Sequence, residues 1–143
     1  MVPRRSRFAD CYAVTVNVAR RIFLLAGIVG ILFVAPLYFS ETRIGREQPP
    51  PITHPEYFYG FIGVTLVWQI FFLVIARDPM RYRPLMLVAI LEKVSYAFAT
   101  PILFALGRVP LETFAAGLVD AGFAVLFAIA YRKTPSQPHQ QRT

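Results

Sequence analysis

The sequence has few of the residues on which soluble enzymes and metal sites depend. Of its 143 residues only 16% are charged, two are histidines, and one, Cys11, is a cysteine. A single cysteine excludes an internal disulfide and a cysteine-rich metal site. The motifs of serine hydrolases, zinc proteases, P-loop proteins and dinucleotide-binding folds are absent as well. We therefore expect no metal and no cofactor, and the composition favours a non-enzymatic role without requiring one.

Apolar residues, in contrast, are abundant. Hydrophobic residues make up 56% of the chain and aromatic residues 15%, and the mean hydropathy is +0.50. These values are too apolar for a soluble domain of this length and are typical of an integral membrane protein. The net charge of +7 would suggest nucleic acid in a soluble protein. Here the arginines lie at the ends of apolar runs, so membrane topology explains them and we expect no nucleic-acid partner.

Four apolar runs are each long enough to cross a bilayer once. They predict an all-α, antiparallel bundle of four transmembrane helices at about 21–40, 56–76, 84–106 and 111–131. Residues 1–134 then form one domain, whose first apolar run is expected to be an uncleaved signal-anchor helix, and 135–143 form a polar, disordered tail. Residues 1–21 are expected to extend the first helix along the membrane interface. The proline-rich segment 41–55 is expected to be an extended loop.

The basic residues predict the orientation of this bundle. Five lie in residues 1–21, three in 77–84 and three in 132–143, whereas the two loops on the opposite side carry three in total. Because cytoplasmic loops are enriched in lysine and arginine, both termini should be cytoplasmic. The chain is therefore predicted to be a multi-pass protein of the inner (plasma) membrane.

Glycines and one proline modify the predicted helices locally. Gly27 and Gly30 in the first helix, and Gly60 and Gly63 in the second, lack side chains and would let a neighbouring helix approach closely. Pro101 removes a backbone hydrogen bond in the third helix and is expected to kink it.

Charged residues near the middle of an apolar run are the strongest functional signal. Glu92 and Lys93 are adjacent in the third run, and an ionisable residue at mid-membrane costs roughly 2.5–3.5 kcal/mol on insertion scales. They lie ~12–14 Å from the predicted cytoplasmic end of their helix. Gln69 at ~12 Å and Asp120 at ~16 Å fall in the same layer of two other helices. Four polar side chains on three helices are thus predicted to share one depth.

Two interpretations of this layer remain open. In the first it is structural: Lys93 and Asp120 form a buried ion pair, and Glu92, which points ~100° away from Lys93, bonds to Gln69, Tyr96 or water. In the second the layer lines a cavity in which a carboxyl exchanges protons or holds a polar ligand head. The candidate ligand-binding or proton-linked residues are Trp68, Gln69, Glu92, Tyr96 and Asp120.

The layout resembles known membrane proteins in outline. Four short-looped helices, the segment DPMRYRP at 78–84 and a charged residue midway through the third helix are similar to small, uncharacterised four-helix inner-membrane proteins of bacteria. A fainter similarity is to the emopamil-binding and sigma-2-receptor group, whose loops are longer. That resemblance implies an intramembrane acid that binds amines or assists sterol isomerisation, with Trp68, Glu92, Tyr96 and Asp120 as residues of the right type.

Three functions are compatible with these features. The protein can bind a lipid-like or amine ligand in the central pocket or act as an accessory subunit of a homo-oligomer or larger membrane complex. It can be a small proton-coupled transporter that uses Glu92 and Asp120. It can also be an isomerase-type membrane enzyme with Glu92 as acid or base. The sequence favours the first of these.

Overall fold

The computed structural model describes the backbone of residues 4–136 and the side chains of residues 14–136, and this part of the chain is helical with no strand. Cys11 and residues 137–143 of the predicted tail therefore lie outside what is described. The elements are α1 (Arg4–Val34), the short 3-10 helix η1 (Ala35–Phe39), α2 (Glu41–Glu47), α3 (Pro55–Arg77), α4 (Leu85–Ala105) and α5 (Leu111–Lys133).

Four segments are long and apolar enough to cross a membrane: Val14–Phe39, Pro55–Arg77, Leu85–Ala105 and Leu111–Lys133. The predictions of an all-helical chain and of four spans are thereby confirmed. The basic lead continues the first helix back to Arg4 without a break, as expected of an extension of that helix, and the candidate span begins at Val14 and not at the predicted residue 21.

The extended loop predicted for residues 41–55 is wrong in its first half, where α2 forms. An acid at Glu41 and a base at Arg46 suit the dipole of this helix. Arg43 Nε also lies 2.9 Å from Glu47 Oε1, one turn further on. The prolines at 49–51, which favour an extended chain, begin only after the helix has ended at Glu47.

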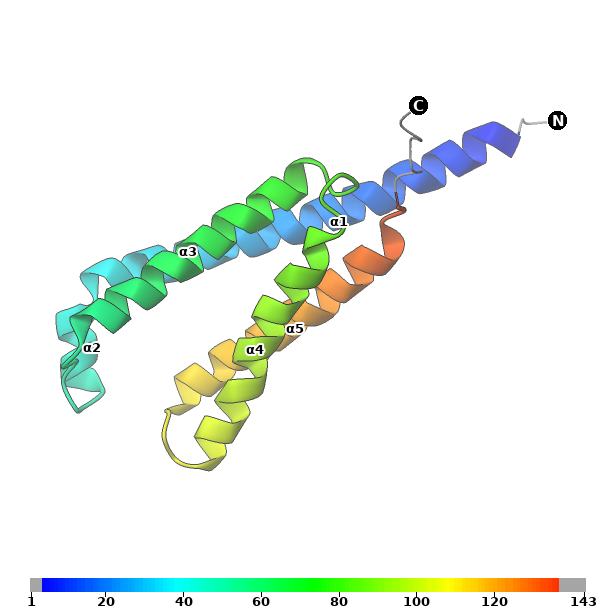
Figure 1. Cartoon of the computed structure of the whole chain (residues 1–143). Helices are drawn as coiled ribbons and strands as arrows, with labels where there is room; N and C mark the ends of the chain where they lie inside the picture. Colours follow the sequence, from blue (N-terminus) through cyan, green and yellow to red (C-terminus); the bar gives the residue numbers. More distant parts are fainter. Residues whose placement is uncertain (1–3, 137–143) are drawn as a thin grey trace.

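The helices form two pairs that meet at one end and part at the other (Figure 1). In one pair α1 lies beside α3, and in the other α4 lies beside α5. The pairs meet near residues 78–84, which connect α3 to α4, and we call this end the junction. They separate toward the opposite end, which carries α2 and the turn at 106–110 and which we call the open end.

The apolar core sits at the junction and draws on all four long helices. Phe23 of α1 stacks on Phe127 of α5 with ring centroids 4.2 Å apart, and Phe72 of α3 meets Phe127 edge-on at 5.0 Å. Smaller side chains complete the same buried cluster: Ala19, Ala26, Ile75, Ala76, Met86, Ala89 and Ala130. This core holds the two pairs together.

Glycines, which have no side chain, let the helices of each pair approach closely. A Cβ on Gly27 would lie 2.9 Å from the backbone oxygen of Gln69, and a Cβ on Gly30 would overlap the Gln69 side chain. In the other pair Gly117 packs against the Thr100 side chain in the same way.

The predicted packing patch on the second helix is only half correct. Gly63 faces the Tyr38 hydroxyl, 3.3 Å from an added Cβ. Nothing lies within 4 Å of a Cβ on Gly60, so that glycine makes no close contact.

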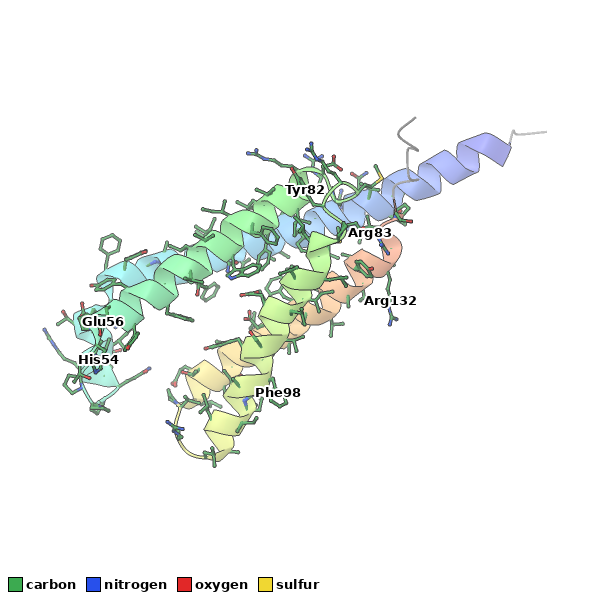
Figure 2. The ribbon with its side chains drawn as sticks, in the orientation of Figure 1. His54, Glu56, Tyr82, Arg83, Phe98 and Arg132 are labelled. Carbon is green, nitrogen blue, oxygen red and sulfur yellow. The ribbon has the colours of Figure 1, made fainter. Side chains whose placement is uncertain are left out.

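Arg83 fastens the start of α4 to the end of α5 at the junction (Figure 2). Its Nε donates a hydrogen bond to the Thr134 carbonyl oxygen at 2.7 Å, and its guanidinium lies 4.0 Å from the centroid of the Tyr131 ring. We expect Arg83→Ala to lower the free energy of unfolding by about 2 kcal/mol, because a charged hydrogen bond and a cation–π contact are both lost. Unfolding in mixed micelles measures this change, and an unchanged midpoint would contradict it.

Candidate functional site

A cluster of three charged side chains lies between α4 and α5, next to the junction core. Lys93 Nζ of α4 is 3.0 Å from Asp120 Oδ1 of α5 and donates a hydrogen bond to it. The same ammonium is 3.4 Å from Glu92 Oε2. The Lys93 side chain is 7% exposed, and those of Glu92 and Asp120 are 16% and 19% exposed. We call Glu92, Lys93 and Asp120 the triad.

Helical periodicity correctly placed Lys93 near Asp120 but wrongly separated Lys93 from Glu92. The two Cα–Cβ bonds diverge by ~100°, yet the four-carbon stem of lysine is long enough to carry the ammonium back toward its neighbour. Glu92 also forms no hydrogen bond with Gln69 or Tyr96 among the described residues, where Oε2 has no hydrogen-bond partner. Its partner is the Lys93 charge.

An aromatic ring from the other helix pair lies beneath the ammonium. Lys93 Nζ is 5.3 Å from the centroid of the Phe72 ring on α3, close enough for a cation–π interaction. Phe72 is itself fully buried in the junction core. The triad therefore touches both helix pairs and sits where they begin to part.

Gln69 belongs to a different interface from the triad. Its side chain is buried against Gly30 of α1, and its Nε2 donates to the Thr65 carbonyl oxygen at 3.1 Å. The depth estimate could not show which neighbour it faces. The structure thus places Gln69 in the α1–α3 contact.

Trp68 and Tyr96 lie near the triad, and neither side chain forms a hydrogen bond within residues 14–136. Trp68 meets Phe71 edge-on, with centroids 5.2 Å apart, and lies 6.4 Å from Phe72. Tyr96 is half-buried one turn after Glu92, and its carbonyl oxygen accepts a hydrogen bond from the Thr100 hydroxyl at 3.1 Å. Pro101 follows directly, and α4 continues through it to Ala105, so the expected kink stays a prediction.

Sequence reasoning missed Phe72 as a member of the site. The chain has 13 phenylalanines, and nothing in the spacing of this one separates it from those that face lipid. It lies one turn after Gln69, but this spacing does not indicate that its ring contacts Lys93.

The remaining chemistry of the described residues is sparse. No group of three or more His, Cys, Asp and Glu side chains there could hold a metal ion. His54 Nδ1 lies 3.0 Å from Glu56 Oε1 at the start of α3, at the open end (Figure 2).

Comparison with protein-family models, curated proteins and solved structures finds no match for this chain.

Proposed function

We propose that the protein is a multi-pass membrane protein that binds a lipid-like ligand with an amine head group at the triad. The observation that carries the proposal is Glu92 Oε2, a buried carboxylate oxygen with no hydrogen-bond partner among the described residues. The Lys93 ammonium, 3.4 Å away, offsets part of its charge but also pairs with Asp120. A ligand N–H aimed at this oxygen would supply the hydrogen bond that it lacks.

The charge of the triad supports a cationic ligand. With all three groups ionised, two carboxylates face one ammonium, which leaves one net negative charge. A second ammonium, brought by the ligand, would balance it in a region of low dielectric constant. A protonated amine supplies both a hydrogen-bond donor for Glu92 Oε2 and a positive charge, whereas an alcohol of equal length supplies no charge.

The surroundings of the triad support an apolar tail. Large side chains on the neighbouring turns of α4 are exposed, with Leu91 at 66% and Phe98 at 71%. In a bilayer such surfaces contact acyl chains. A single-chain amphiphile could therefore place its head at the triad and its tail among lipids.

The proposed topology places the helices antiparallel, with both termini in the cytoplasm and the protein in the inner membrane. The asymmetry of basic residues supports this orientation, since the junction end carries most of them. The triad would then lie nearer the cytoplasmic face than the outer face.

We expect Glu92→Gln to weaken binding of a tritiated long-chain primary amine by tenfold or more, because a charged hydrogen bond is worth about 1.5–3 kcal/mol. Equilibrium binding to purified protein in nanodiscs measures this, with empty nanodiscs subtracted for partitioning. Glu112→Gln is the matched control, since Glu112 is exposed at the start of α5.

Equal binding by wild type and Glu92→Gln would contradict the proposal, as would equal binding of the amine and the matching alcohol. A variant that loses stability but keeps amine binding would indicate a structural triad. If wild type is stable only together with another protein, the accessory role gains support. Amine-driven or proton-driven flux in vesicles that stops in Glu92→Gln would favour the transporter.

A further inference from the structure

Exposed basic side chains surround the junction end of the molecule. They come from α1, the end of α3, the link to α4 and the end of α5. We call them the basic collar: Arg20, Arg21, Arg77, Arg81, Arg132 and Lys133. Arg83 is half-buried and engaged with Tyr131 and Thr134, so it is not included.

The core brings collar residues of three helices to the same end of the molecule. Ala19, Ala76 and Ala130 belong to a single buried cluster. Arg20 and Arg77 each directly follow one of these alanines, and Arg132 comes two residues after Ala130. Figure 2 shows Arg132 close to Arg83 at this end of the molecule. The convergence of the helices therefore concentrates positive charge.

Among the described residues, acidic side chains do not pair with the collar. Within residues 14–136 none of its six members forms an ion pair, and the Asp78 carboxylate accepts a hydrogen bond from the backbone N–H of Arg81. At the open end the situation differs, because Arg43 pairs with Glu47. Like charges held close together repel each other, and here that repulsion acts against the meeting of the two helix pairs.

Four members of the collar lie at the height of lipid head groups. The apolar spans end at Arg77 and Lys133, the next one begins at Leu85, and Arg81 lies in the link between spans. The ends of membrane-spanning helices sit at the membrane–water interface whichever way the protein is oriented. Arg20 and Arg21 lie six and seven residues after the start of the first span at Val14, and their long side chains can extend toward the interface. Arginine binds phosphate oxygens through two parallel N–H donors, which suits the head group of an acidic phospholipid.

We propose that the basic collar binds the head groups of acidic phospholipids, which hold the junction together by neutralising its charge. The bound lipid phosphates stand between arginines of different helices. This contact does not depend on any ligand at the triad.

The test uses the full-length protein in vesicles of phosphatidylcholine, alone or in equimolar mixture with phosphatidylglycerol. We expect a higher unfolding midpoint in the mixture and retained phosphatidylglycerol in native mass spectra. Arg132→Gln with Lys133→Gln should weaken this retention roughly fivefold for each charge removed. Arg20→Gln with Arg21→Gln should weaken phosphatidylglycerol retention to a similar extent. Two independent double variants keep the test valid if one of them folds poorly.

The matched control removes two charges from the open end, Arg43→Gln with Arg46→Gln, and should retain the lipid as wild type does. Replacing Arg20 and Arg21 by lysine keeps the charge and should preserve most of the stabilisation. Salt near 1 M, where the screening length is about 3 Å, should abolish the lipid preference. Equal retention of both lipids by wild type, or an equal loss in the open-end control, would overturn the proposal.

Discussion

Lys93→Met is expected to destabilise the protein by about 3–5 kcal/mol, because the change leaves two carboxylates buried without their cation. Lys93 Nζ is within 3.4 Å of both acids and also lies over Phe72. Its removal therefore weakens contacts between α4 and α5 and between the two helix pairs. Equilibrium unfolding in mixed micelles, followed by loss of helical circular dichroism, measures the change.

Two further variants separate the charge effect from simple loss of packing. Lys93→Met combined with Asp120→Leu removes both ends of the ion pair, and we expect it to recover most of the stability, since buried pairs are often replaceable by apolar residues. Arg108→Met removes an exposed cation from the turn between α4 and α5, away from the triad and the collar, and should change stability by less than about 0.5 kcal/mol. If Lys93→Met unfolds at the wild-type midpoint, the triad does not hold these helices together.

Gly27→Val is expected to cost about 3 kcal/mol, at the upper end for overpacking. An added Cβ would lie 2.8 Å from Leu73 Cγ and 2.9 Å from the Gln69 backbone oxygen. A leucine side chain can rotate away, but the backbone oxygen moves only if α1 and α3 separate. The same unfolding assay measures the cost, and disulfide crosslinking between cysteines introduced on α1 and α3 should slow down.

Glycines elsewhere provide the controls. Nothing lies within 4 Å of a Cβ built on Gly60 or Gly122. Gly60→Val and Gly122→Val place the same side chain in a membrane helix without a clash, so each should change stability by less than about 0.5 kcal/mol. If all three variants lose equal stability, valine itself and not the contact with α3 is responsible.

Helix number and type followed from composition because twenty-residue apolar runs have one stable form in a bilayer, where the backbone must bond to itself. The meeting of Lys93 with Asp120 also followed from counting residues along helices whose lengths are set by the membrane. Position along a helix axis can be computed in this way from the chain alone.

Direction around each helix could not be computed in the same way. Gln69 and Phe72 are one turn apart on α3 and both contact α1, through Gly30 and Phe23, yet only Phe72 also lies under Lys93. Which way α3 is rotated depends on Gly27 and Gly30, and so on a partner that periodicity does not identify. Lys93 shows a second limit, because a long side chain can reach a neighbour that its own Cβ points away from.

The position of Trp68 gives the protein an intrinsic optical probe. It is the only tryptophan in the chain, and its indole packs on the Phe72 ring that lies under the Lys93 ammonium. Indole emission shifts with the polarity and rigidity of its surroundings. The fluorescence of Trp68 should therefore report structural changes at the triad or at the junction without an added label. A brominated acyl chain that settles beside α3 would quench that emission directly, and the spectrum of the unmodified protein is the baseline.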